Sequence, residues 1–430
     1  MSVAKEVIRV AVIGAGAAGL VALRHLSSQT ETFQAFGFEQ TGVVGGTWVY
    51  NENTGSDEYG LPIHSSMYRD LRTNLPKEVM AFPDFPFEKD GPSFITHQAV
   101  RKYLEDYAEH FKLKPLIKFF TEVESVKPVQ GQHGEQVWQI QYKDVRVKDS
   151  LVETLETDAV IVCNGHYSVP VIPDFPGMEK FSGQVLHSHD YRYPEPFKDK
   201  VVCCLGAGAS GQDIMLELAK TAKQVILSHN KAPLKSDLPA NIHQASGIDA
   251  MTETGAVMKD GEECHFDVLI LCTGYHYTFP FLSPECSLNI EDERVIPLYK
   301  HIIHTECPRL SFIGICKQIC PFPQFHNQVK FVLKTLDGSL KLPTKEEMDA
   351  DIKQDFEWRL GQGFPKRHAH TMGPMQWQYN DELADIGQFE HIPKVVEQLY
   401  QDVHKVRVTQ LQHYKKCNYR LTGPDSYIEV

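Results

Sequence analysis

Residues 14–19 near the start of the chain have the spacing Gly-x-Gly-x-x-Gly, which is typical of a turn that binds a dinucleotide. In such a turn Gly14 permits the tight bend, Gly16 lets backbone amides approach a pyrophosphate, and Gly19 lets the following helix pack closely. Glu39 ends the next predicted strand, where a carboxylate binds a ribose 2′-hydroxyl and repels a 2′-phosphate. The sequence therefore predicts an FAD or NAD site formed by Gly14, Ala15, Gly16, Ala17, Ala18, Gly19 and Glu39.

A second cluster of glycines follows closely behind Glu39, in the segment Gly-Val-Val-Gly-Gly-Thr-Trp at residues 42–48. One interpretation is an ordinary loop with Trp48 as a core aromatic residue. The other is a loop that wraps the remainder of a long cofactor, which favours FAD over NAD. On that interpretation the further contacts are Gln40, Gly46, Thr47 and Trp48.

The same glycine spacing recurs at residues 206–211, again between a predicted strand and a predicted helix. The strand after it ends in Ser-His-Asn-Lys at residues 228–231 and has no carboxylate. Hydroxyl, imidazole and ammonium groups suit a 2′-phosphate, so this site is predicted to bind NADP, although a solvated strand end explains each residue alone. The predicted contacts are Gly206, Gly208, Ala209, Ser210, Gly211, Ser228, His229 and Lys231.

The elements that position these turns alternate between strands and helices, which predicts an α/β fold with parallel sheets. Strands are expected at residues 8–14, 33–39, 200–206 and 224–228, and helices at 17–27 and 211–221; two buried strands, 158–165 and 267–274, also end in glycine. We expect two Rossmann-like dinucleotide-binding domains, with the NADP domain inserted into a discontinuous FAD domain. The expected boundaries are 1–167 and 281–430 for the FAD domain, with a helical C-terminus from Thr344 and over 392–411, and 168–280 for the NADP domain.

The composition of the 430-residue chain excludes several other classes of protein. The 43 Lys and Arg residues against 56 Asp and Glu give a net charge of −13, which is unfavourable for nucleic-acid binding. No run reaches the roughly 18 apolar residues that a membrane helix needs. The ten cysteines are scattered and form no disulfide framework, and the 20 histidines show no convincing metal-ligand spacing. We therefore expect a cytoplasmic protein without a metal or a membrane partner.

Three segments resemble the flavin-containing monooxygenase family, and the resemblance extends from residue 8 to about residue 335. Residues 181–191 match the family's pattern Phe-x-Gly-x-x-x-His-x-x-x-(Tyr/Phe). Residues 68–80 resemble the block that carries the family's flavin-facing Asn, and residues 272–275 resemble its Ala-Thr-Gly-Tyr signature with Cys272 in place of Ala. The wording of residues 38–50 and 64–68 is most similar to the soluble insect members, some of which are pyrrolizidine-alkaloid N-oxygenases.

The resemblance implies that NADPH reduces FAD and that O2 then forms a C4a-hydroperoxyflavin, which oxygenates a soft nitrogen or sulfur. Asn74 would be the catalytic hydrogen-bond donor, although its local sequence alone indicates a turn residue. Further cofactor contacts would be Thr73, Val123, Thr273 and Gln328, and Tyr275, His326 and Asn327 could line the flavin or substrate pocket. The implied partners are a small amine or sulfide and O2, in xenobiotic or alkaloid detoxification, and the helical C-terminus could form a homodimer.

Three alternatives remain open from the sequence. A flavin disulfide reductase needs a spaced pair of redox cysteines, and the closest spaced pair is Cys316 and Cys320 with three residues between them. A Baeyer–Villiger monooxygenase usually ends the residue 181–191 motif in Trp, where this chain has Tyr191. A nucleotide-binding sensor without activity would not need Asn74.

Overall fold

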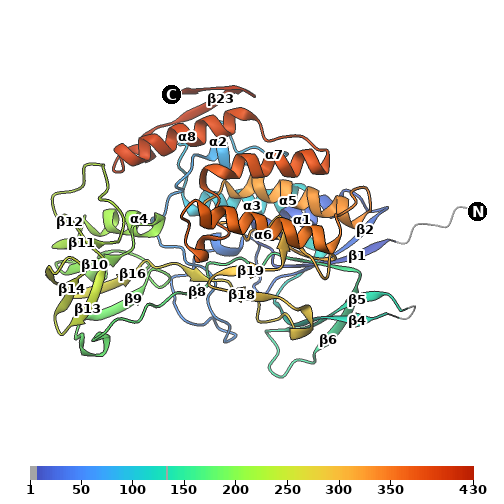
Figure 1. Cartoon of the computed structure of the whole chain (residues 1–430), viewed down its shortest axis with the longest axis horizontal. Coiled ribbons are helices and arrows are strands. Elements are labelled where there is room, and N and C mark those ends of the chain that lie inside the picture. Colours follow the sequence, from blue (N-terminus) through green and yellow to red (C-terminus); the bar gives the residue numbers. More distant parts are fainter. Residues whose placement is uncertain (1–6, 132–133) are drawn as a thin grey trace, which may run out of the picture.

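The computed structural model describes residues 7–131 and 134–430 (Figure 1). Its largest sheet has seven strands. The strand order is β20-β21-β22-β7-β1-β2-β3, with β22, β7, β1, β2 and β3 parallel. The strands are β1 (Ile8–Ile13), β2 (Phe33–Phe38), β3 (Ile117–Lys118), β7 (Ala159–Val162), β20 (Leu298–Tyr299), β21 (Ile303–His304) and β22 (Leu310–Phe312). All four residues of β7 are buried, as expected for a strand covered on both faces of a parallel sheet.

Helices cover one face of this sheet and a small antiparallel sheet covers the other (Figure 1). The helices are α1 (Ala17–Ser27), α3 (His97–His110), α5 (Pro321–Leu336), α6 (Lys345–Gly361) and α7 (Gln376–Gly387). Their apolar residues form one core with alternate residues of β1 and β7. The opposite residues of those strands pack against β4 (Thr121–Gln130) and β5 (Gln136–Asp144), which pair with β6 (Glu153–Thr157).

A second parallel sheet of five strands has the order β12-β11-β10-β16-β9. Its strands are β9 (Gln184–His187), β10 (Val201–Leu205), β11 (Gln224–Ser228), β12 (Ile242–Ala245) and β16 (Val268–Leu271), and helix α4 (Ala209–Leu218) follows β10. An antiparallel sheet of β13 (Ile248–Thr252), β14 (Gly255–Met258) and β15 (Glu263–His265) packs against it. The predicted strand–helix–strand units around both glycine turns are therefore confirmed.

Two short strands connect the parts of the chain that carry the two sheets. β8 (Val169–Pro170) precedes the second sheet and pairs antiparallel with β17 (Tyr275–His276), which follows it. All strands of the second sheet thus lie between this pair in the sequence, which is the arrangement of an inserted unit. The boundaries 1–167, 168–280 and 281–430 stay a prediction, and residues 1–6 lie outside the described part of the chain.

The C-terminal segment is mostly helical, as predicted, and its helices contribute to the apolar cores of both sheets. Thr344 caps α6 through a capping box with Glu347. Helix α8 (Lys394–Thr409) contacts α2 (Lys77–Met80), and its buried residues belong to one apolar cluster with residues of β10, β11 and α4. Because α8 buries its apolar face within its own chain, it offers little support for the expected homodimer.

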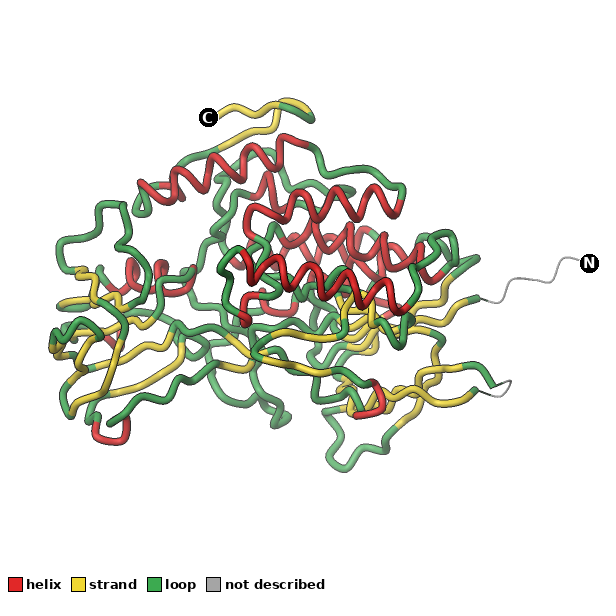
Figure 2. Tube along the Cα trace, in the orientation of Figure 1, coloured by secondary structure: helices red, strands yellow, loops and turns green. Residues whose placement is uncertain are grey.

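The helices do not extend to the end of the chain. After α8 the chain forms a hairpin of β23 (Tyr419–Gly423) and β24 (Ser426–Glu429), drawn as the outermost strands in Figure 2. Another hairpin, of β18 (Asn289–Glu291) and β19 (Arg294–Ile296), lies beside the helices. Two strands of four or five residues give little sequence periodicity, and Gly423 and Pro424 are the local turn signals. Among the described residues, no helix has the length and apolarity to cross a membrane.

Candidate active site

The first glycine turn joins β1 to α1 and has a backbone that only glycine adopts easily. Gly14 has a φ of +102°, and a Cβ atom there would lie 2.5 Å from the carbonyl oxygen of Cys163 at the end of β7. A Cβ atom at Gly19 would lie 1.8 Å from the carbonyl oxygen of Gly14. The first and third glycines therefore let the helix and the neighbouring strand approach the turn, as the spacing predicted.

The second glycine cluster lies directly against this turn. The amide of Gly45 donates to the carbonyl of Ala15 at 3.0 Å, and a Cβ atom at Gly46 would lie 2.9 Å from Cα of Gly16. No side chain caps the first turn of α1, whose N-cap is Gly16, so its backbone amides remain available to an anion. The hydroxyl of Thr47 is buried and has no hydrogen-bond partner within residues 7–131 and 134–430. This cradle of glycines, free amides and an orphaned hydroxyl fits the pyrophosphate of a long dinucleotide.

Glu39 lies at the carboxyl end of β2, beside the first glycine turn. One carboxylate oxygen accepts from the amide of Ala15 at 2.9 Å, and the other accepts from the amide and hydroxyl of Thr41 at 2.9 and 2.8 Å. Burial raises the pKa of this carboxyl, while the hydrogen bonds from Thr41 and Ala15 oppose the rise. Gln40, the next residue, is half-buried. The amide of Thr121, the first residue of β4, donates to the carbonyl of Glu39. Val123 lies in the same strand and is half-buried.

The second glycine turn repeats the geometry of the first. Gly206 has a φ of +115°, and a Cβ atom there would lie 2.5 Å from the carbonyl oxygen of Cys272. A Cβ atom at Gly211 would lie 1.8 Å from the carbonyl oxygen of Gly206, which is the same distance as that from a Cβ atom at Gly19 to the carbonyl oxygen of Gly14. Gly208, the N-cap of α4, faces open space, and Ala209 and Ser210 are exposed. The first turn of α4 is therefore open to a second anionic ligand.

The end of β11 places the residues expected at the 2′-phosphate. The Ser228 hydroxyl donates to the carbonyl of Ser246 at 2.7 Å, and Nδ1 of the buried His229 accepts from the amide of Lys231 at 3.1 Å. Lys231 itself is exposed. Burial lowers the pKa of His368, and the charges of Arg367 and Lys231 add to this effect. Lys231 therefore lies near a basic turn from the C-terminal part of the chain, which the sequence analysis did not connect with this site.

Asn74 is half-buried and is held by the C-terminal end of the chain. Its Oδ1 accepts a hydrogen bond from the hydroxyl of Tyr414 at 3.1 Å. The neighbouring Lys415 donates to the carbonyl of Arg72 at 3.0 Å and forms an ion pair of 2.6 Å with Asp213 in α4. Thr73 is buried, with its backbone and hydroxyl bonded to Ile95. The Asn74 segment therefore lies between the second glycine helix and residues 414–415.

Histidine and tyrosine rings gather where β7, β9 and β16 end. The ring centroids of His187 and His189 lie 5.1 and 5.9 Å from that of Tyr275, and His166 contacts Tyr167, which contacts Tyr275. Burial lowers the pKa of His187 to about 4 and that of His166 to about 3, so both are neutral at pH 7. One ring nitrogen of each of His166, His187 and His189 is buried and has no hydrogen-bond partner in the part of the chain that the structure describes. These orphaned nitrogens, at the carboxyl ends of both sheets, mark a place where a polar ligand fits.

The remaining predicted residues have structural partners. The Thr273 hydroxyl donates to the carbonyl of Val171 at 2.5 Å. Gln328 is fully buried, accepts from the amide of Gly314 at 3.1 Å and donates to Tyr379 at 3.0 Å. It therefore fixes the turn after β22 from inside the helical layer. His326 and Asn327 line a separate cavity beside α1 and α5, away from the glycine turns.

The closest spaced pair of cysteines does not form a redox pair. Both Cys316 and Cys320 are buried and free, and the thiol of Cys320 donates to the carbonyl of Val79 at 2.7 Å. Burial raises the pKa of Cys316 to about 12, and it raises that of Cys320 as well. Because thiol–disulfide exchange needs an accessible thiolate, this pair does not support a disulfide reductase.

Comparisons with known proteins agree with this geometry. A family model described as flavin-binding monooxygenase-like matches residues 7–234 and 230–428. Flavin-containing monooxygenase FMO GS-OX4 of Arabidopsis thaliana is 40% identical over 405 residues, covering 89% of this chain and 85% of the relative. The structure of S-allyl-L-cysteine S-oxygenase from Allium sativum has a TM-score of 0.88 and 36% identity and covers 96% of each chain. That of Tmm from Pelagibacter sp. strain HTCC7211 has a TM-score of 0.86 and 30% identity, covering 98% of this chain and 96% of that one.

Proposed function

The chain belongs to the flavin-containing monooxygenase family and is an FAD- and NADPH-dependent enzyme, and from this premise we propose that it oxygenates the soft sulfur or nitrogen of a small molecule. In the overall reaction, substrate, O2, NADPH and one proton give the S-oxide or N-oxide, water and NADP. The observation that carries this proposal is that each of the two parallel sheets has a glycine turn followed by a helix without a side-chain cap, and that ring nitrogens without hydrogen-bond partners among the described residues lie at the carboxyl ends of the same sheets.

We place a thioether sulfur first among the substrates and a tertiary amine second. The support for sulfur is the S-oxygenase named for the structure from Allium sativum, which is 36% identical over almost the whole chain. The sequence analysis placed nitrogen first, on its likeness to the insect enzymes. Pyrrolizidine alkaloids stay a prediction, and the acidic surface of the chain, with a net charge of −13, favours cationic amines weakly at physiological salt.

The protein's share of the reaction is positioning and exclusion of water. The first glycine turn with Glu39 and Thr47 would hold FAD, and the second with Lys231 would hold NADPH. When bound, the flavin supplies the activated oxygen atom, so the chain needs no nucleophile of its own. The neutral His166 and His187 bring no charge to the site, and a dry, uncharged surrounding suits transfer of oxygen to a soft nucleophile.

The test compares several substrates and measures, for each, the amount of oxygenated product formed per NADPH consumed. FAD-loaded enzyme is given NADPH and O2 with S-allyl-L-cysteine, a simple dialkyl sulfide, a tertiary amine or a pyrrolizidine alkaloid. We expect one oxygenated product per NADPH for at least one sulfide, measured by mass spectrometry with labelled O2. Oxidation of NADPH that yields only hydrogen peroxide with every substrate would contradict the proposal, and exclusive turnover of the amines would reverse the order of sulfur and nitrogen.

Replacement of Lys231 is expected to change the choice between the two nicotinamide cofactors. Lys231→Ala should raise the KM for NADPH about tenfold and leave that for NADH unchanged, because a hydrogen bond to a charged group contributes about 1.5–3 kcal/mol. Lys223→Ala is the matched control, since Lys223 is an exposed cation before the opposite end of β11. The KM values are determined from steady-state rates measured with NADPH and with NADH. An equal change for NADPH and NADH would remove Lys231 from the 2′-phosphate site.

A further inference from the structure

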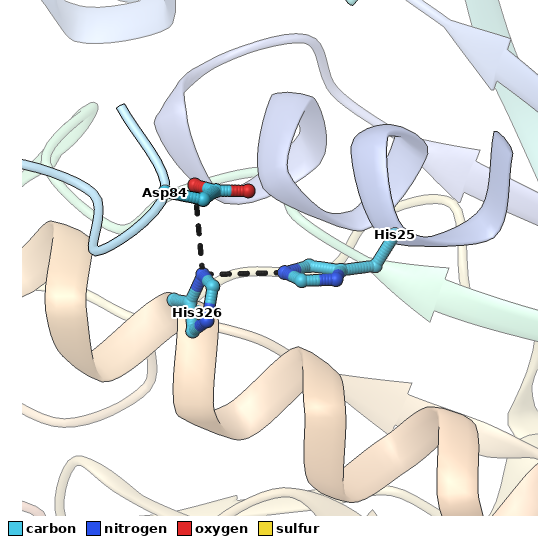
Figure 3. Close-up of side chains that lie close together, drawn as sticks. All are labelled: His25, Asp84 and His326. Carbon is cyan, nitrogen blue, oxygen red and sulfur yellow. Dashed lines mark hydrogen bonds and ion pairs between the residues drawn. The ribbon is translucent and has the colours of Figure 1, made fainter. Parts of the chain in front are cut away.

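Three side chains from distant parts of the sequence point toward one another on the helical side of the large sheet (Figure 3). His25 lies in the last turn of α1, His326 lies in α5, and Asp84 comes from the loop between α2 and α3. His25 Nε2 and His326 Nδ1 are 3.2 Å apart, and His326 Nδ1 lies 3.9 Å from Asp84 Oδ1. One nitrogen of each histidine and one oxygen of Asp84 all lie within 4.8 Å of one another.

These distances resemble those of ligands around one metal ion. Two nitrogens at about 2.0–2.1 Å from a tetrahedral zinc ion are separated by about 3.3 Å, close to the distance between the two histidines. The Asp84 oxygen needs only a small side-chain movement to reach the same point. Two imidazoles and a carboxylate are ligands that zinc and similar transition metals accept, whereas magnesium and calcium prefer oxygen alone.

If His25 and His326 only form a hydrogen bond with each other and no metal is present, the carboxylate of Asp84 is left without a hydrogen-bond donor from either ring. One N–H proton can lie between His25 and His326, and neither imidazole then offers a donor to Asp84 Oδ1. Both oxygens of Asp84 are buried and have no hydrogen-bond partner among the described residues, although Oδ2 forms an ion pair with Arg24 at 3.2 Å. A cation in the centre would be shared by all three facing atoms.

A second observation at the same place also indicates a ligand. His25, Asp84 and His326 line a cavity of 320 Å³. Asn327 lines it too and is only 2% exposed, and its side-chain Nδ2 has no hydrogen-bond partner among the described residues. The cavity admits a water molecule as a fourth ligand, and the amide of Asn327 is available to bind that water.

The positive charges nearby are already compensated. Arg24 faces Asp84 Oδ2 and stacks on Phe111 at 4.3 Å from the ring centroid, so Oδ1 stays free toward the histidines. Such an outer partner holds a ligating carboxylate in place. Lys330 forms an ion pair of 2.6 Å with Glu390.

We propose that His25, Asp84 and His326 bind one divalent transition-metal ion of the zinc class, with water as the fourth ligand. The site is structural. It clips the end of α1, whose beginning forms the first glycine turn, to α5 and to the loop at residue 84, and so stiffens the helical layer behind the FAD site. It has no part in oxygen transfer and stands independently of the proposed function.

The test measures metal binding by the FAD-loaded enzyme after removal of any affinity tag and treatment with a chelator. Titration with ZnCl2 is expected to show one tight site, and Co2+ is expected to give the intense visible spectrum of a tetrahedral complex. His326→Ala and the isosteric Asp84→Asn should each weaken zinc binding by at least about 100-fold, more than a change outside the ligand shell usually does. Zinc should also raise the melting temperature of the unmodified enzyme and not that of these variants.

His391→Ala is the matched control, because His391 lines the same cavity but both its ring nitrogens face Asp381 and Asp385 at 2.8 and 2.9 Å. It should bind zinc as the unmodified enzyme does. FAD content and circular dichroism establish that each variant is folded. Absence of a tight zinc site in the unmodified enzyme, or equal binding by folded Asp84→Asn, would overturn the proposal.

Discussion

A Gly14→Val variant is expected to purify without FAD, as colourless protein. The position has a φ of +102°, which a β-branched residue rarely adopts, and the new Cβ atom would lie 2.5 Å from the carbonyl oxygen of Cys163. Overpacking of this kind costs about 1–3 kcal/mol, and the turn must shift to relieve it. Because the shifted amides no longer face the pyrophosphate, we expect FAD affinity to fall at least about 100-fold. The measurement is the ratio of flavin to protein absorbance, followed by titration with FAD.

The control for this variant is Gly91→Val. Gly91 has a φ of +88°, but a Cβ atom there has no neighbour within 4 Å, so the substitution brings the same backbone strain without the collision. It should retain FAD. Since Gly14→Val could also fail to fold, NADPH binding by the second glycine turn is measured in parallel. A folded Gly14→Val protein that is as yellow as the unmodified enzyme would contradict the assignment of the first turn.

The parts of the fold that the sequence predicted are those set by local patterns. A strand, a glycine turn and a helix occupy about twenty consecutive residues, so their spacing alone predicts β1 with α1 and β10 with α4. The same glycines predict the close approaches, because the Gly14–Gly19 and Gly206–Gly211 contacts lie within one turn. Glu39 was found in the same way, at the end of the next strand.

The parts that the sequence did not predict depend on contacts between distant residues. Asn74 and Tyr414 are 340 residues apart, and no spacing rule connects them. Helix α8 was predicted from its periodicity, but which sheet its apolar face would cover was not. His326 was expected near the flavin because it belongs to a resembling segment, yet α5 turns it toward His25. A helix places successive side chains in different directions, so neighbours such as His326 and Gln328 have different surroundings.

Asn74→Ala is expected to lower oxygenation about 100- to 1000-fold while FAD remains bound. This expectation follows from our proposal that Asn74 is the catalytic hydrogen-bond donor. The Tyr414 hydroxyl donates to Oδ1 of Asn74, and the Nδ2 group of the same amide is the donor that we assign to the reaction. Removal of one such preorganised donor from an active site costs about 2.7–4 kcal/mol. The measurement pairs product formation with anaerobic reduction of FAD by NADPH, which should change little.

Two further variants separate the donor from its support. Asn74→Asp keeps the oxygen that accepts from Tyr414 but replaces the amide donor with a second acceptor, so it should be at least as inactive as Asn74→Ala. Tyr414→Phe removes only the hydrogen bond that orients the amide, and loss of about 1 kcal/mol should lower kcat about fivefold. In all three, NADPH consumed without product should appear as hydrogen peroxide. An Asn74→Asp enzyme that forms product at the unmodified rate would show that the side chain at this position only supports the C-terminal segment.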